Sequence, residues 1–133
     1  PLYMAYHTQL GEPTEVFHND LRGRFNRGES DVVDAMQQFA QYAEEGCDAI
    51  QSNDLTRLAK LIDANFNTRQ RIAELPSWQV DMVETARECG ASAKFAGSGG
   101  AIVGTYNNDA MLQRLSEKLS AIGSQVVAIR PDM

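Results

Sequence analysis

The stretch Ser92-Ala93-Lys94-Phe95-Ala96-Gly97-Ser98-Gly99-Gly100-Ala101-Ile102-Val103-Gly104-Thr105-Tyr106 decides the fold of this 133-residue chain. Its two ends, 92–96 and 101–106, are short and rich in β-prone residues. Four small residues, Gly97 to Gly100, separate them, and clustered glycines at such a point are typical of a tight turn. The pattern therefore predicts a β-hairpin with a glycine-rich turn at its tip.

The glycine turn has two interpretations. Glycines at this density are needed where the backbone adopts positive φ or approaches a ligand closely, and consecutive amides in such a turn can bind an anion. A flexible hairpin turn without a ligand explains the glycines equally well. The turn is not a P-loop, because no Gly-Lys-Ser/Thr follows it. It is not a dinucleotide fingerprint either, because Ile102 replaces the third glycine and a strand follows.

Helical periodicity dominates the chain before this hairpin. Apolar residues recur every three or four positions in two long segments joined by Gln51-Ser52-Asn53, which predicts a helical hairpin. We expect the apolar residues of its first helix, from Val32 to Ile50, to form one buried stripe. The other expected elements are strands over 2–7 and 125–129 and helices over 17–25, 78–89 and 108–122.

The order of these elements predicts the fold class. Strand, helices, strand, strand, helix, strand suits an α+β protein with a ferredoxin-like antiparallel sheet, helices packed on one face, and extra helices inserted. No repeat or linker divides residues 1–133, so we expect a single domain. The chain opens at Pro1 without an initiator Met and runs directly into a predicted strand, so we also expect it to be a fragment.

Composition and charge exclude several functions. The formal net charge is −6, which argues against a nucleic-acid-binding surface. No apolar run approaches the ~20 residues needed to span a bilayer, and no secretory leader pattern is present. Cys47 and Cys89 are expected to be reduced thiols rather than a disulfide or a metal pair. These features predict a cytoplasmic protein without a nucleic-acid or membrane partner.

Cationic side chains gather in two short regions of this acidic chain, Arg22, Arg24 and Arg27 close to His18, and Arg69 with Arg71. The planar guanidinium suits carboxylate and phosphate groups, so two such regions meeting in a cleft would bind an anionic ligand. Surface ion pairs with Asp20, Glu29 or Glu74 are the alternative explanation.

The sequence identifies no catalytic residue. It contains no Ser-His-Asp order, no paired-carboxylate motif and no metal-ligand spacing around His7 or His18. The acidic pairs Glu44-Glu45 and Glu84-Glu88 are typical of solvated helix faces. The catalytic groups are therefore unknown, and we expect no metal site within this chain.

The segment Lys94-Phe95-Ala96-Gly97-Ser98-Gly99-Gly100 resembles the third conserved motif of the GHMP kinases, a superfamily of small-molecule kinases. Ala96 and Ser98 stand where that motif usually carries threonine and alanine. Two upstream runs, His18-Asn19-Asp20-Leu21-Arg22-Gly23-Arg24-Phe25 and Asn65-Phe66-Asn67-Thr68-Arg69-Gln70-Arg71, are similar to the glucuronokinase-like branch of sugar kinases. The resemblance covers nearly the whole chain.

This resemblance implies the C-terminal domain of a two-domain sugar kinase that uses ATP and Mg²⁺ to phosphorylate a sugar, such as glucuronate, at its anomeric hydroxyl. The nucleotide, the metal and the catalytic groups would be bound mainly by an N-terminal domain, so the fragment alone would be inactive. The resemblance assigns Lys94, Gly97, Ser98, Gly99 and Gly100 to a loop near the phosphates. It assigns substrate binding to His18, Arg22, Arg24, Arg69 and Arg71.

Three alternatives remain open. A heptose-phosphate kinase or another GHMP sugar kinase would use the same arginines to bind a substrate phosphate. A stand-alone ferredoxin-like module could bind a small metabolite in a regulatory role. A structural dimerisation domain could be built on the helical hairpin. The oligomeric state does not follow from the sequence.

Overall fold

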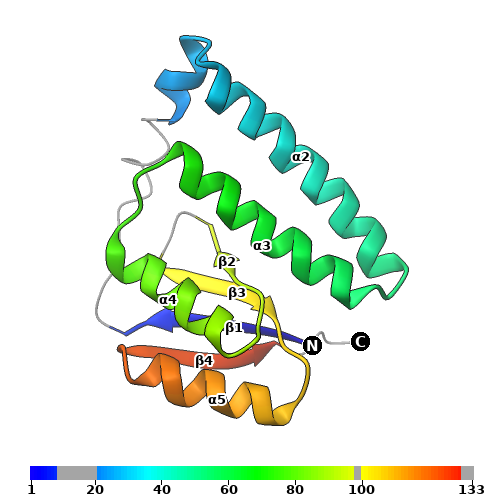
Figure 1. Ribbon diagram of the computed structural model, residues 1–133, viewed down its shortest axis with the longest axis vertical. Coiled ribbons are helices and arrows are strands. Elements are labelled where there is room, and N and C mark those ends of the chain that lie inside the picture. The colour runs from blue at the N-terminus through cyan, green and yellow to red at the C-terminus, as the bar shows by residue number, and fades with distance from the viewer. Residues whose placement is uncertain (9–20, 98–99, 130–133) are drawn as a thin grey trace.

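A four-stranded antiparallel sheet forms the centre of the computed structural model, which describes residues 1–8, 21–97 and 100–129. The strands are β1 (Leu2–His7), β2 (Lys94–Phe95), β3 (Ala101–Thr105) and β4 (Ser124–Ile129). They lie in the order β2-β3-β1-β4, so that the first strand of the chain is central (Figure 1). The predicted α+β class and ferredoxin-like order are confirmed.

Two helices, α4 (Ser77–Glu88) and α5 (Asp109–Ser120), cover one face of the sheet (Figure 1). Successive residues of a strand point to opposite faces, so β1 directs alternate side chains toward these helices. Tyr3 and Ala5 are buried in the core that α4 and α5 complete, whereas Met4 lies on the other face and is only partly buried. One face of the sheet therefore carries the core.

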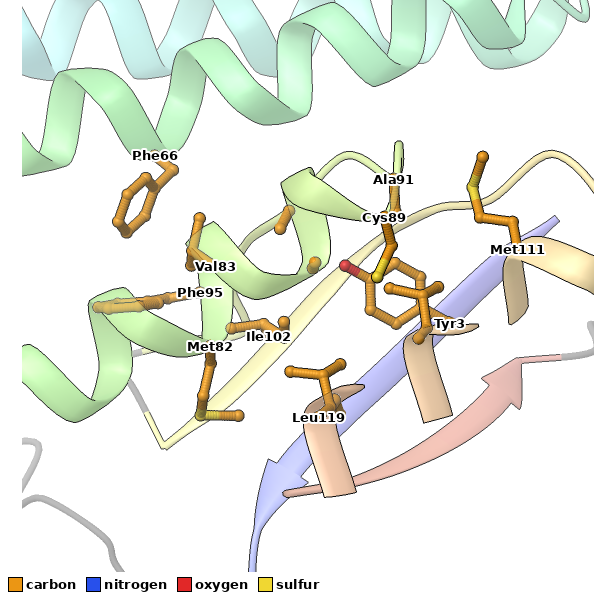
Figure 2. Close-up of a cluster of buried hydrophobic side chains, with 14 residues drawn as sticks. Tyr3, Phe66, Met82, Val83, Cys89, Ala91, Phe95, Ile102, Met111 and Leu119 are labelled. Carbon is orange, nitrogen blue, oxygen red and sulfur yellow. The ribbon is translucent and has the colours of Figure 1, made fainter. Parts of the chain in front are cut away.

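The main core lies between the sheet, α4 and α5, and it extends to the longer helix α3 (Leu55–Ile72) (Figure 2). Each large apolar side chain that is fully buried contributes about 1.5–3 kcal/mol relative to an exposed one. The buried members are Tyr3, Ala5, Phe66, Met82, Val83, Ala86, Cys89, Ala91, Ala93, Phe95, Ile102, Met111, Leu115 and Leu119. Because Phe66 and Phe95 belong to it, α3 is fixed against strand β2.

Ser92 and Gly104 approach each other closely where the chain enters the β-hairpin. A β-carbon at position 104 would lie 1.8 Å from the carbonyl oxygen of Ser92. The Tyr3 hydroxyl donates a 2.8 Å hydrogen bond to the same oxygen. The Ser92 hydroxyl accepts from the backbone amide of Thr105 at 2.8 Å, and these groups are all buried. Glycine at 104 therefore permits the contact that places β2 and the glycine turn.

The predicted helical hairpin is formed by α2 (Ser30–Gln51) and α3, which lie side by side (Figure 1). Asp54 caps α3 by accepting a hydrogen bond from the amide of Arg57 at 3.1 Å. The single buried stripe expected on α2 is wrong for its second half: Val32 is fully buried, but Ile50 is 61% exposed. Periodicity marks an apolar face, yet α3 alone among the described elements packs extensively on α2.

Most helix boundaries agree with the sequence prediction. Gly90 and Gly123 have φ values of 91° and 84° just after α4 and α5. Asn108 caps α5 by accepting from the amide of Met111 at 2.9 Å. The cap of α2 is Glu29, which forms no side-chain capping bond. Residues 21–26 are helical, whereas the expected start of that helix at 17 lies outside the described residues.

Candidate functional site

The glycine turn closes the predicted β-hairpin. The amide of Ala96 donates a 2.9 Å hydrogen bond to the carbonyl of Ala101 across it. Gly97 and Gly100 adopt φ values of 76° and 86°, a backbone conformation that residues with a β-carbon rarely adopt. The amide of His7 donates to the Gly100 carbonyl at 3.2 Å, so the turn is fastened to the central strand. Ser98 and Gly99, also assigned to this loop, lie outside the described residues.

Arg69 reaches the turn from helix α3. Its Nη1 atom donates a 2.6 Å hydrogen bond to the Gly97 carbonyl. The guanidinium also stacks over Phe95, with 4.9 Å between the carbon Cζ and the ring centroid. One helical turn earlier, Phe66 meets the same ring edge-on at a centroid distance of 5.2 Å. The Phe66-Phe95 contact therefore brings α3 close enough for Arg69 to bind the turn.

Lys94 is the second cation of the site. It is half-buried on β2, and burial together with the positive charge of Arg69 lowers the pKa of its ammonium group. Within the described part of the chain, Lys94 forms no ion pair and no hydrogen bond through its side chain. A bound anion would offset both the desolvation of Lys94 and its repulsion from Arg69. This arrangement suits a carboxylate or a phosphate.

A cavity of about 220 Å³ lies beside these two cations. Its lining combines both of them with apolar side chains and one amide, and the residues are Leu21, Phe39, Asn65, Arg69, Ile72, Lys94 and Gly97. A second hollow of about 160 Å³ between α2 and α3 shares Phe39, Asn65 and Lys94 with the first. The two hollows therefore adjoin at Lys94.

A polar network fixes the chain segment that leads to Lys94. The amide of Ala93 donates to Oδ1 of Asp63 at 2.9 Å, and Nε of Arg87 lies 3.2 Å from the same oxygen. Arg87 also donates to the side chain of Asn67 at 2.8 Å and stacks over Phe66. Sequence reasoning missed Asp63 and Arg87, because nothing in the spacing of α3 and α4 shows that their polar faces meet.

Arg24, expected in the substrate site, is tied to the start of α2. It donates to the backbone carbonyl of Ile72 and pairs with Asp31 at 3.1 Å and with Glu29 at 3.6 Å. These carboxylates neutralise the guanidinium locally. In the described structure, Arg24 therefore links the segment 21–26 to α2 and α3.

The other expected substrate ligands do not join Lys94 in its cavity. Arg71 donates to the side chains of Gln38 at 3.0 Å and Thr68 at 3.1 Å, and it lines a separate hollow. Arg22 is exposed. His18 lies outside the described residues. Of the five expected substrate-binding residues, Arg69 is the one that the described structure brings to the glycine turn.

Two further features concern metal ligands and membrane-spanning helices among the described residues. These residues contain no group of three or more His, Cys, Asp or Glu side chains that could hold a metal ion. None of their helices combines the length and the apolar character that crossing a bilayer requires.

A family model and two curated relatives match most of this chain. A family model described as "GHMP kinases C terminal" matches residues 47–125. The chain is 36% identical to Probable glucuronokinase 2 and 35% identical to Glucuronokinase 1 of Arabidopsis thaliana, each over 106 residues. These matches include 77% of this chain but 29% of each relative.

The fold matches a solved structure of L. major mevalonate kinase in complex with R-mevalonate, with a TM-score of 0.81. That alignment covers 90% of this chain and 38% of the other, at 22% sequence identity. At this identity the likeness shows the fold alone. The chain thus corresponds to less than half of each protein compared.

Proposed function

Because this chain belongs to the family of GHMP kinase C-terminal domains, we propose that it is the substrate-side, C-terminal domain of an ATP-dependent sugar kinase. The proposed substrate is a sugar acid such as glucuronate, phosphorylated at its anomeric hydroxyl. The observation that carries the proposal is the position of Lys94, half-buried beside Arg69 at the glycine turn. The 36% identity to a probable glucuronokinase supports the choice of a sugar acid.

In this proposal the two cations have different roles. Lys94 lines the cavity without a described counterion, so it faces the carboxylate or the phosphoryl group directly. Arg69 donates to Gly97 and thereby holds the turn, while its charge adds to the positive potential of the cavity. Phosphoryl transfer depends mainly on positioning and on charge stabilisation, so a rigid cationic wall is what this half of an active site needs to supply.

ATP and Mg²⁺ are proposed to bind mainly to the N-terminal half of the kinase. Lys94 fits the phosphate group of the phosphorylated product. The described residues offer no acidic cluster that fits Mg²⁺. The isolated chain is accordingly expected to lack kinase activity, because it contributes one wall of a cleft between two domains.

The test uses the full-length kinase that contains this chain. Lys94→Met should raise KM for glucuronate by about tenfold or more, since a charged hydrogen bond is worth ~1.5–3 kcal/mol. Arg69→Ala should also raise KM for glucuronate, because the cavity loses a positive charge and the turn loses the bond to Gly97. KM for ATP should change little. Arg57→Ala is the matched control, because Arg57 lies on α3, as Arg69 does, and pairs with Glu45 at the surface.

Two outcomes would redirect the proposal. Unchanged glucuronate kinetics in both site variants would remove the cation site. A wild-type enzyme that prefers a sugar phosphate to glucuronate would assign the same two cations to a substrate phosphate, as in a heptose-phosphate kinase.

A further inference from the structure

Asn65 is the one amide side chain among the described residues that line the cavity beside Lys94 and Arg69. It lies on α3 one helical turn before Arg69, so both side chains share a face of the helix. Asn65 lines the 220 Å³ cavity and also the adjoining 160 Å³ hollow. It therefore stands where the two spaces meet, beside Lys94.

The amide of Asn65 supplies a chemical function that the cations lack. Lysine and arginine side chains only donate hydrogen bonds, whereas an asparagine side chain both donates and accepts. The Gly97 carbonyl of the same cavity already accepts from Arg69. Among the residues that line the 220 Å³ cavity, Asn65 is thus the neutral polar side chain that can accept from a hydroxyl.

The surroundings leave this amide available to a ligand. In the described part of the chain, Asn65 takes part in no side-chain hydrogen bond. The Asn65 side chain is partly buried, so it is only partly exposed to bulk water. Phe39 and other apolar side chains form the rest of the wall and can pack against the C–H surface of a sugar ring.

We propose that Asn65 is a specificity-determining residue that binds one hydroxyl of the sugar while Lys94 binds the anionic group. This inference rests on the proposed function. A buried polar group that loses its partner is penalised strongly, so a site of this kind discriminates between hydroxylated and deoxygenated sugars. The chemical class selected would be a polyhydroxylated acid rather than a simple carboxylate.

The experiment measures KM and kcat of the full-length kinase, wild type and Asn65→Ala, with glucuronate and its 2-, 3- and 4-deoxy analogues. Asn65→Ala should raise KM for glucuronate by about tenfold, the effect of losing one hydrogen bond of ~1.4 kcal/mol. For one deoxy analogue, wild type and variant should have the same KM, because the hydroxyl that Asn65 binds is already absent. Gln70→Ala, which removes an exposed amide from the same helix, should match wild type with every sugar.

The outcomes separate the two proposals. If Lys94→Met raises KM for glucuronate but Asn65→Ala does not, the cation site holds and the role of Asn65 is overturned. An equal ratio of KM values between variant and wild type for all four sugars would also overturn it, because no single hydroxyl would then be bound. If neither Lys94→Met nor Arg69→Ala affects any sugar, the proposed function itself fails. The unfolding midpoint of Asn65→Ala should equal that of wild type, which excludes a general loss of structure.

Discussion

The Arg69 guanidinium and the Gly97 carbonyl are joined by a 2.6 Å hydrogen bond between helix α3 and the glycine turn. The bond fixes one carbonyl of a turn whose glycines would otherwise allow many conformations. Its donor carries a charge, so the same contact that orders the turn also makes the adjoining cavity positive.

Arg69→Lys should separate these two contributions. Lysine keeps the charge but loses the planar fork and the stacking on Phe95. We expect Arg69→Lys to retain more glucuronate affinity than Arg69→Ala, while both variants lose about 1–2 kcal/mol of unfolding free energy. Substrate kinetics and urea denaturation measure the two effects. Equal KM values for the two variants would show that the charge of Arg69 has no part in binding.

Lys94→Met should stabilise the fold near neutral pH while weakening anion binding. The pKa of Lys94 is lowered in the folded protein, so the unfolded chain binds this proton more tightly. The protonated Lys94 therefore lowers the free energy of unfolding. This destabilisation is present in full below the pKa of Lys94 in the folded protein and is lost as pH rises toward the usual value of 10.5. Urea denaturation from pH 7 to pH 10 should therefore show the advantage of Lys94→Met shrinking with pH. An advantage independent of pH would contradict an electrostatic origin.

Asp63→Ala should destabilise the entry to β2. It removes the acceptor of the Ala93 amide and the partner of Arg87, so we expect a loss of about 2–3 kcal/mol in urea denaturation. Glu45→Ala is the matched control, because it breaks the more exposed pair with Arg57 and should cost less than about 1 kcal/mol. Equal losses would mean that the Asp63 network contributes no more than a surface pair.

Two glycine-to-alanine changes should alter the stability of the fold in opposite directions. At Gly104 a β-carbon would meet the Ser92 carbonyl at 1.8 Å, so Gly104→Ala should cost about 3 kcal/mol or prevent folding. At Gly46, inside α2, the nearest atom to the new carbon is 4.0 Å away. Gly46→Ala should therefore add about 0.5–1 kcal/mol, the usual helix preference for alanine. Thermal denaturation of both variants checks the contrast, and two changes of the same sign would refute it.

Local signals explain why so much of the fold could be predicted. The β-prone residues around Gly97 define the hairpin, Gly90 marks the end of α4, and Asn108 marks the start of α5. Each of these residues acts on its immediate neighbours, so its effect is visible in a short window of sequence. The ferredoxin-like order followed from the sequence of elements that these signals delimit.

The site was predictable only in part, because it depends on contacts between distant segments. Arg69 and Arg71 look equivalent in the sequence, yet side chains two positions apart on a helix point in very different directions. The packing of Phe66 on Phe95 decides that Arg69 faces the turn and Arg71 faces Gln38. The same limit explains the error on α2, since an apolar stripe does not reveal how much of it a neighbour covers.

The central position of β1 constrains how the sheet can assemble. Leu2 pairs with Thr105 on one side and with Ile129 on the other. A ribosome making this chain must therefore finish β4 before the central strand has both of its neighbours. Until then β1 exposes a free hydrogen-bonding edge, and contacts so distant in sequence form slowly. Between the synthesis of β1 and that of β4, this strand can therefore pair with another chain.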